Sequence, residues 1–234
     1  MGWGGLSEAF DEKNGAWYNE YQKLKSLLSP EEYASAREST LNAHYTSPII
    51  IRSIYDTLGR MGFEKGNILE PSIGIGNFFG MLPERMQDSR LYGVELDSLT
   101  GRIAKQLYPK AEIQISGFEK TNHPKDFFDV VVGNVPFGQY KVADKPYDKH
   151  NFLIHDYFLA KSLDKVRPGG IVAVVTSKGT MDKKSPAVRK YLAQRAELLG
   201  AVRLPNTAFK ANAGTEVTSD ILFFKKRDRV VDLE

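Results

Sequence analysis

The chain has 234 residues, of which 41% are hydrophobic, 26% are charged and 11% are aromatic, and these proportions exclude disordered and fibrous proteins. It contains no cysteine, which excludes disulfides, cysteine-ligated zinc, iron–sulfur clusters and a cysteine nucleophile. The net charge of +3 is too small to indicate a nucleic-acid-binding protein by itself.

The start of the chain, MGWGGLSEAFDEKNG, lacks the basic region and the following apolar region of a signal peptide. No apolar run in the sequence approaches the roughly 18 residues of a membrane span. We therefore expect a cytoplasmic protein without a membrane partner.

Residues 17–40 predict two short helices. Apolar side chains recur at helical spacing as far as Leu28, and Ser29-Pro30-Glu31-Glu32 then supplies an N-cap, a first-turn proline and first-turn acids. A third helix is predicted from about Pro48 to Met61, with one apolar face. That face consists of Ile50, Ile51, Ile54, Tyr55 and Leu58.

Short apolar runs then alternate with segments of helical spacing, which indicates a largely parallel sheet with right-handed crossovers. The last two runs are separated only by an irregular stretch, so they predict an antiparallel pair. The predicted strands are 67–70, 90–95, 112–116, 127–134, 169–177, 198–205 and 219–226. The predicted fold class is therefore α/β, a seven-stranded, mostly parallel, doubly wound Rossmann-like sheet.

A glycine turn follows the first predicted strand, in ILEPSIGIGNFF. Gly74 and Gly76 let the backbone approach a ligand, although such glycines also serve simply to close a turn. Phe79 replaces the third glycine of the pyrophosphate-binding pattern, and Glu95 ends the second strand, where a carboxylate can accept hydrogen bonds from both ribose hydroxyls. This combination favours a nucleoside without a diphosphate.

The fourth predicted strand runs directly into Asn134, Val135, Pro136 and Phe137. A polar amide at the end of a buried strand is costly unless something bonds it. The run therefore indicates either a substrate-binding turn or a strand stop with a capping asparagine.

Together, E-P-x-x-G-x-G-x-F, the acidic end of the second strand and N-x-P-F after the fourth resemble the gamma-type S-adenosylmethionine-dependent N6-adenine DNA methyltransferases, over about residues 44–227. GWGGL, LNAHYTSP and the segment from NVPFGQY to VRPGG are also similar to the methylase portion of large helicase-methyltransferase fusion proteins of bacterial mobile elements. The resemblance implies a class I methyltransferase fold over residues 44–228, with a helical N-terminal extension over 1–43 and a tail over 229–234.

The resemblance also implies roles for single residues. S-adenosyl-L-methionine is the expected cofactor, and the residues expected to bind it are Thr46, Glu70, Gly74, Gly76, Glu95 and Ser116. Ser116 or a main-chain group is expected to replace an aspartate that the family commonly places near Gly117 to bond the adenine amine. Asn134, Val135, Pro136 and Phe137 match the catalytic tetrapeptide, in which the family usually has proline where Val135 stands. Restoring that proline is expected to be tolerated.

The resemblance places two aromatic side chains against the target base. Phe137 is expected to stack on a base flipped out of the duplex, while the Asn134 side chain and the Val135 carbonyl hold its amine. Phe209 is expected to contact the same base, but a place in the core is an equally open interpretation.

The C-terminal part of the chain gathers positive charge, including Lys183, Lys184 and Lys190. These lysines are interpreted as the outer face of an amphipathic helix or as a DNA-facing surface. His150 and His155 have no third ligand near them in the sequence, so we expect no metal and a surface or capping role.

The function expected from the resemblance is methyl transfer to adenine N6 in DNA, with DNA as partner and with helicase and recognition regions in the same longer polypeptide. Two alternatives stay open. A methyltransferase acting on RNA or on a protein glutamine amide uses the same acceptors, because each target is a planar amine. A catalytically silent domain that binds nucleic acid is the other alternative.

Overall fold

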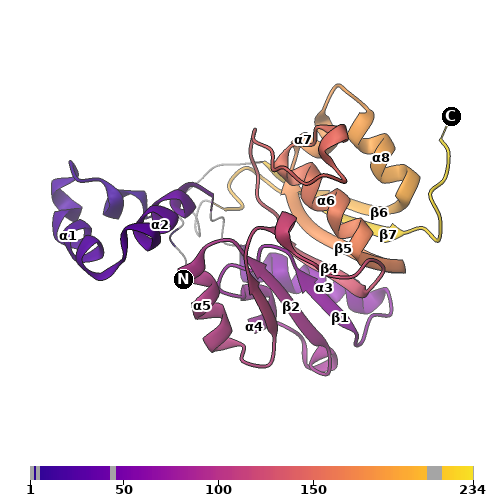
Figure 1. Ribbon diagram of the computed structural model, residues 1–234. Helices are drawn as coiled ribbons and strands as arrows, with labels where there is room; N and C mark the ends of the chain where they lie inside the picture. Colours follow the sequence, from indigo (N-terminus) through magenta and orange to yellow (C-terminus); the bar gives the residue numbers. More distant parts are fainter. Residues whose placement is uncertain (1–2, 4–5, 43–45, 210–217, 234) are drawn as a thin grey trace.

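A computed structural model describes residue 3 and residues 6–42, 46–209 and 218–233 (Figure 1). The expected boundary between residues 43 and 44 therefore lies outside the described residues. Seven strands form one sheet in the order β3-β2-β1-β4-β5-β7-β6. Their bounds are β1 Asn67–Glu70, β2 Arg90–Glu95, β3 Glu112–Ile115, β4 Phe128–Asn134, β5 Val166–Ser177, β6 Ala196–Arg203 and β7 Ser219–Lys226.

The predicted topology is confirmed. Strands β1 to β5 are parallel, and β7 pairs antiparallel with both β5 and β6. Strands β1 and β4 are neighbours although they are not consecutive in the chain, with Leu69 opposite Val131. The direction of strand order therefore reverses between β1 and β4, and in open parallel sheets this switch point is where ligands bind.

Alternate side chains of the central strands enter two different cores, one on each face of the sheet. Val131 and Val174 belong to a cluster with α6 (Ile154–Lys165) and α8 (Ala187–Arg195). Val130 and Val175 belong to a cluster with α3 (Pro48–Arg60). The buried residues of α3 are the five that the sequence predicts. Both faces are covered, which explains why the central strands are almost wholly apolar.

The other helices are short. Helices α4 (Asn77–Gly80) and α7 (Gly179–Asp182) have four residues each, and α5 (Ser98–Leu107) packs on β3. Single turns of 3-10 helix span Glu84–Met86 (η3), Phe118–Lys120 (η4) and Asp148–His150 (η5). No helix in the described part of the chain has the length and apolar character needed to cross a membrane.

The N-terminal extension contains η1 (Ser7–Phe10), η2 (Gly15–Trp17), α1 (Tyr18–Leu27) and α2 (Pro30–Asn42), as predicted for its two longer helices. It has a small core of its own around Ala9, Phe10 and Ala36. Figure 1 shows the extension beside the α5 side of the sheet. The Ser29 hydroxyl accepts a hydrogen bond from the Glu32 main-chain N–H, and the Glu32 carboxylate accepts one from the Ser29 N–H. This capping box starts α2 at the predicted position.

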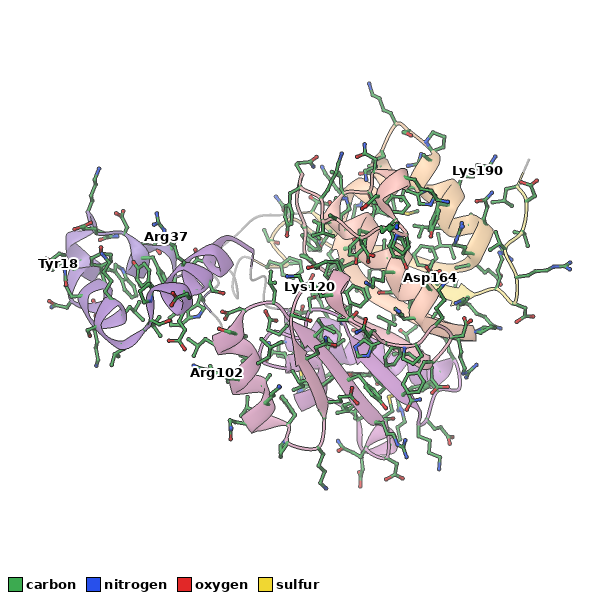
Figure 2. All side chains as sticks on the ribbon, viewed as in Figure 1. Tyr18, Arg37, Arg102, Lys120, Asp164 and Lys190 are labelled. Atoms are coloured by element: carbon green, nitrogen blue, oxygen red, sulfur yellow. The ribbon has the colours of Figure 1, made fainter. Side chains whose placement is uncertain are left out.

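The C-terminal lysines correct one interpretation. Lys183 and Lys184 precede α8, which begins at Ala187, so they do not lie on its outer face. Lys183 pairs with the buried carboxylate of Asp156. Lys190, marked on α8 in Figure 2, is exposed as predicted.

Candidate functional site

A pocket of about 470 Å³ opens at the carboxyl ends of β1 to β4. Segments far apart in the sequence form its wall, because parallel strands bring their carboxyl ends to one edge of the sheet. Eight of the predicted site residues line it: Thr46, Glu70, Gly74, Glu95, Ser116, Asn134, Val135 and Pro136. The residues assigned to the cofactor and those assigned to catalysis therefore share one cavity.

Glu95 fixes the glycine turn. Its Oε2 accepts a hydrogen bond from the Gly74 N–H at 2.7 Å, and its Oε1 accepts one from the Asp97 N–H at 2.8 Å. Burial raises the pKa of Glu95, and these main-chain donors counteract part of that rise. Because each carboxylate oxygen has two lone pairs, Glu95 can still accept further bonds from hydroxyl groups in the pocket.

The two glycines of the turn have different roles. Gly74 has a φ of +57° and lines the pocket. Gly76 has a φ of +87°, and a Cβ there would lie 2.3 Å from the Tyr108 ring, so glycine is needed for the backbone and for packing. Gly76 is not among the lining residues, and its expected cofactor contact stays a prediction.

Glu70 is an acid inside the protein. Its side chain is 2% exposed, and burial followed by the nearby Glu95 raises its pKa well above the ordinary value. Its Oε2 has no hydrogen-bond partner among the described residues. A buried carboxylate oxygen without a donor is costly, so this position suits a ligand that brings an N–H group, above all a cationic one.

The turn after β4 is held on both sides. The Ser72 hydroxyl donates to the Asn134 main-chain oxygen at 2.7 Å, and the Val135 N–H donates to the Val175 oxygen at 3.0 Å. The Val135 side chain is 2% exposed and packs in the core on the α6 face. The Asn134 side chain is thus presented to the pocket from a fixed backbone, as orientation of a planar amine requires.

The two aromatic residues expected at the target base lie outside the pocket wall. Phe137 is partly buried and packs against both core clusters. Phe209 is fully buried in the α3-face cluster, so the core interpretation describes its position here, and contact with a base stays a prediction.

Glu119 is a pocket residue that the sequence analysis missed. It lies in η4, just after β3, and its carboxylate folds back so closely that a Cβ on Gly117 would lie 2.1 Å from its Oε1. The Ser116 hydroxyl instead donates to the Gly117 oxygen at 3.2 Å. The available signal was the acid two residues beyond Gly117, close to the point where the family commonly has an aspartate and this sequence has none.

His155 corrects a second interpretation. It lies within α6 at 1% exposure, next to the fully buried Asp156, and not at the surface. Burial, followed by the charge of Lys183, lowers the pKa of His155 to about 4. Within the described ranges, no group of three or more histidines and acids is arranged to hold a metal ion.

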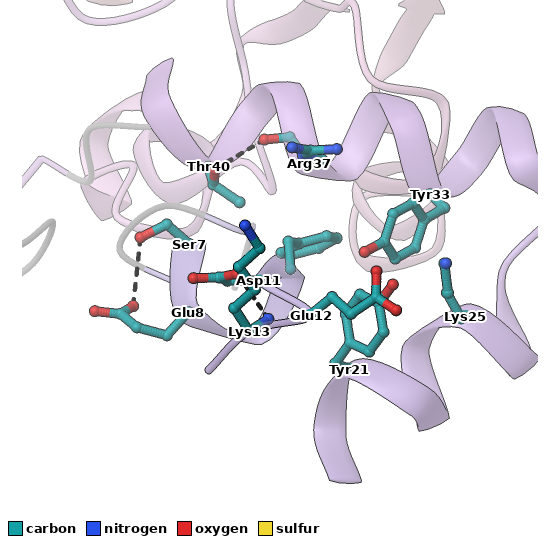
Figure 3. Close-up of a pocket in the computed structure, with 11 residues that line it drawn as sticks. Ser7, Glu8, Asp11, Glu12, Lys13, Tyr21, Lys25, Tyr33, Arg37 and Thr40 are labelled. Atoms are coloured by element: carbon teal, nitrogen blue, oxygen red, sulfur yellow. Dashed lines mark hydrogen bonds between the residues drawn. The ribbon is translucent and has the colours of Figure 1, made fainter. Parts of the chain in front are cut away.

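A second pocket, of about 610 Å³, lies within the N-terminal extension (Figure 3). Charged side chains of both signs line it, including Asp11, Lys13 and Arg37, together with Tyr21 and Tyr33. None of the predicted site residues reaches this pocket, which belongs to a different part of the fold from the strand ends.

The sequence matches the N-6 DNA methylase family over residues 27–232. It is 35% identical over 193 residues to the defense against restriction protein B of Escherichia phage P1, covering 80% of this chain and 8% of that protein. It is 25% identical over 230 residues to the rRNA N(6)-adenosine-methyltransferase metl-5 of Caenorhabditis elegans, covering 93% of this chain and 99% of that protein.

Among solved structures, the fold is similar to a modification subunit assigned to a type I restriction enzyme from Vibrio vulnificus YJ016. The TM-score is 0.64 at 19% identity, over 92% of this chain and 54% of that one. This chain thus spans under a tenth of the phage relative and about half of the Vibrio subunit. The likeness establishes the predicted class I methyltransferase fold.

Proposed function

The chain belongs to the N-6 DNA methylase family, and from this membership we propose that it transfers the methyl group of S-adenosyl-L-methionine to the N6 amine of adenine in DNA. One observation supports this most strongly. Glu70 and Glu95, which suit the cofactor, share a single pocket with Asn134, which suits the target amine. A reaction between two bound groups needs both in one cavity.

The donor set fits this cofactor. Glu95 would accept hydrogen bonds from the ribose hydroxyls, and the Gly74 turn lets the backbone come close to the ligand. The orphaned Oε2 of Glu70 would accept from the ammonium group. Glu119 would accept from the adenine amine, in the role expected of Ser116. The bound cofactor supplies a methyl group on a cationic sulfur, which needs no further activation.

The residues of the chain then act on the second substrate. The Asn134 side-chain oxygen and the Val135 main-chain oxygen would accept the two N–H groups of the adenine amine, which turns its lone pair toward the methyl group. Positive charge develops on that nitrogen, and both acceptors stabilise it. The bonds from Ser72 and to Val175 hold this turn rigid before the substrate arrives.

An adenine within a duplex cannot reach this pocket while it is stacked, so the base must be flipped out. Phe137, directly after the turn, would offer its ring to the flipped base. Such stacking contributes about 1–3 kcal/mol per base, comparable to the cost of unstacking.

The proposed partner is DNA. We propose that this chain binds it as part of a longer cytoplasmic polypeptide that also contains helicase and recognition regions. The phage relative, of which this chain spans only 8%, supports a place within a larger protein. A restriction-modification role is supported by the likeness to the Vibrio modification subunit.

RNA is the second candidate substrate, because the rRNA adenosine methyltransferase of Caenorhabditis elegans matches over 99% of its length. The test is transfer of labelled methyl to duplex DNA, ribosomal RNA and unmodified protein, with the methylated nucleoside identified after digestion. We expect N6-methyladenine in DNA. Label confined to RNA or protein would reassign the substrate, and no label in any acceptor would favour the silent domain.

A further inference from the structure

We propose that the N-terminal extension forms part of the cofactor site, with Trp3 and Ser35 closing the pocket over the adenosine half of the ligand. This inference rests on the proposed function for the identity of that ligand. It assigns cofactor contacts to Trp3, which precedes the family match over residues 27–232, and to Ser35, near the start of that match.

Two parts of the fold that are far apart in the sequence line the pocket, the N-terminal extension and the ends of the strands. Trp3 and Ser35 line it from the extension, while Leu96 and Asp97 line it from the turn after β2. The Trp3 indole is anchored inside the extension, where it packs edge-on against Phe10 with ring centroids 5.4 Å apart and planes at 85°. Trp3, a residue of the pocket wall, is therefore held in place by the core of the extension.

A continuous set of hydrogen bonds joins the extension to the cofactor turn. The Ser35 hydroxyl on α2 donates to Asp97 Oδ1 at 2.8 Å. The Asp97 N–H donates to Glu95 Oε1, and Glu95 Oε2 accepts from the Gly74 N–H. Asp97 is 5% exposed, and its other oxygen caps α5 by accepting from the Thr100 N–H. Movement of α2 would therefore disturb the carboxylate assigned to the ribose.

The polar docking of α2 on α5 is weak by itself. Besides the Ser35 bond, Arg102 pairs with Glu32 at 2.8 Å, with side chains 58% and 22% exposed. Ion pairs this exposed contribute about 0–1 kcal/mol. A ligand under the extension would add contacts to both parts at once, so ligand binding and docking should strengthen each other reciprocally.

The adenosine half is the part of the ligand that this wall fits. Ser35 bonds Asp97, whose main-chain N–H donates to Glu95, the ribose carboxylate, and Trp3 and Leu96 line the same pocket. A flat indole offers a large apolar face to a purine. Stacking on adenosine should be the same for S-adenosylmethionine and S-adenosylhomocysteine, whereas attraction of the indole to the sulfonium would favour the former alone.

The chain has two tryptophans, Trp3 and Trp17, and this makes the proposal directly measurable. Trp17 packs in the core of the extension and is not a pocket residue. In the Trp17→Phe chain, emission from Trp3 should change on titration with S-adenosylhomocysteine and saturate at the dissociation constant found by calorimetry. In the matched Trp3→Phe chain, Trp17 emission should show no saturable change.

Affinity supplies the second readout. Trp3→Ala and Ser35→Ala should each weaken binding of S-adenosylhomocysteine by about five- to twentyfold, and of S-adenosylmethionine by the same factor. The matched control is Ser26→Ala, because the Ser26 hydroxyl donates only to the Lys23 oxygen within α1. That variant should bind as the unmodified chain does. Circular dichroism checks that each variant keeps its helices.

Three results would overturn the proposal. If the unmodified chain binds the cofactor one-to-one, but Trp3 emission does not change and both alanine variants keep their affinity, the extension is not part of the site. The proposed function is then unaffected. Absence of any cofactor binding by the unmodified chain overturns both. Weakening for S-adenosylmethionine alone would contradict stacking on adenosine.

Discussion

At the end of β3, the carboxylate of Glu119 is the group that we expect to accept a hydrogen bond from the adenine amine of the cofactor. It lines the pocket beside Gly117, while the Ser116 hydroxyl is engaged with the Gly117 oxygen. Glu119→Ala should weaken S-adenosylhomocysteine binding by about five- to fiftyfold, because an amine would lose a charged acceptor. The inosine analogue of this ligand has a carbonyl oxygen in place of the amine and offers the carboxylate no donor there, so calorimetry should show no loss of its affinity in Glu119→Ala.

The matched control for Glu119 is Lys120→Ala, since Lys120 is exposed on the same turn and does not line the pocket (Figure 2). Equal losses for the amine-bearing ligand and its inosine analogue in Glu119→Ala would show that the residue acts through general packing. The assignment of Glu119 to the amine would then fail.

Val135 shows how the fold changes an expectation drawn from the family pattern. Restoring proline there would remove the N–H that donates to the Val175 oxygen, at a residue that is 2% exposed. We therefore expect Val135→Pro to lower the free energy of unfolding by about 1–3 kcal/mol in urea titration, contrary to the expected tolerance. Val135→Ala keeps the N–H, so it measures the effect of lost side-chain volume separately from the effect of the lost hydrogen bond. A proline variant as stable as the unmodified chain would mean that this bond contributes nothing.

At the scale of single residues, the motif positions could be predicted because their chemistry follows from their place at strand ends. Gly74, Glu95 and Asn134 line the pocket for that reason. Glu119 was missed because its place in the pocket depends on a 3-10 turn that folds its side chain back over Gly117, although an acid two residues beyond Gly117 was visible in the sequence. Phe209 stayed ambiguous because a lone aromatic before a loop has no periodicity to place it.

Among the elements, strong periodicity predicts well and local boundaries predict poorly. The apolar stripe of α3 and the N-cap of α2 lie where the sequence indicates. Strand β5 begins at Val166, three residues before its prediction, and the pattern of Lys183 and Lys190 predicted one helix where Pro186 separates them. The buried Asp156 draws Lys183 inward, and only the tertiary structure reveals that partner.

Helix α6 and the α7 segment enclose a histidine that should make stability depend on pH. His155 is 1% exposed, and its pKa falls to about 4 from the ordinary 6.5, so the unfolded chain binds more protons between these values. Above pH 6.5 the imidazole is neutral in both states and does not affect the free energy of unfolding. As the pH falls from 6.5 toward 4, the unfolded chain takes up a proton that the folded chain does not, so the free energy of unfolding decreases. Between pH 7.5 and 4.5 the loss should be about 2–3 kcal/mol.

The measurement is urea unfolding at both pH values for the unmodified chain and for His155→Gln. The two chains should differ by that amount in their change between pH 7.5 and 4.5, because the other titrating groups are common to both. Identical pH dependence would show that His155 titrates normally in the folded protein.

For the whole molecule, the exposed positive charge sets how the chain meets DNA. Lys184 and Lys190 are exposed, while Lys183 and Arg203 are paired with acids inside the protein. Binding to short duplexes should be weak, tolerant of sequence and steeply dependent on salt. The Lys184→Ala, Lys190→Ala double variant should flatten the plot of log affinity against log salt by about 2 if both lysines contact phosphates.

Fluorescence anisotropy across a salt series measures this slope. Tight binding to one short sequence that persists at high salt would show that specific recognition resides in these residues. An unchanged slope in the double variant would show that Lys184 and Lys190 do not belong to the DNA-binding surface.

The contact between the extension and the pocket is also a property of the whole molecule. Helical spacing predicts α1 and α2, but the bond from Ser35 to Asp97 joins residues 62 positions apart and depends on how two parts of the fold dock. Local pattern holds no information about such a contact.

The central claim is that one pocket holds the cofactor through Glu95 and the target amine through Asn134. Its most direct test measures cofactor affinity by calorimetry and methyl transfer to DNA in the same two variants. Asn134→Ala should lower the rate by about 10²–10³ and leave affinity unchanged, because its partner is the substrate. Glu95→Ala should weaken cofactor binding by about 1–3 kcal/mol. A fully active Asn134→Ala chain, or one that loses the cofactor together with activity, would contradict the account.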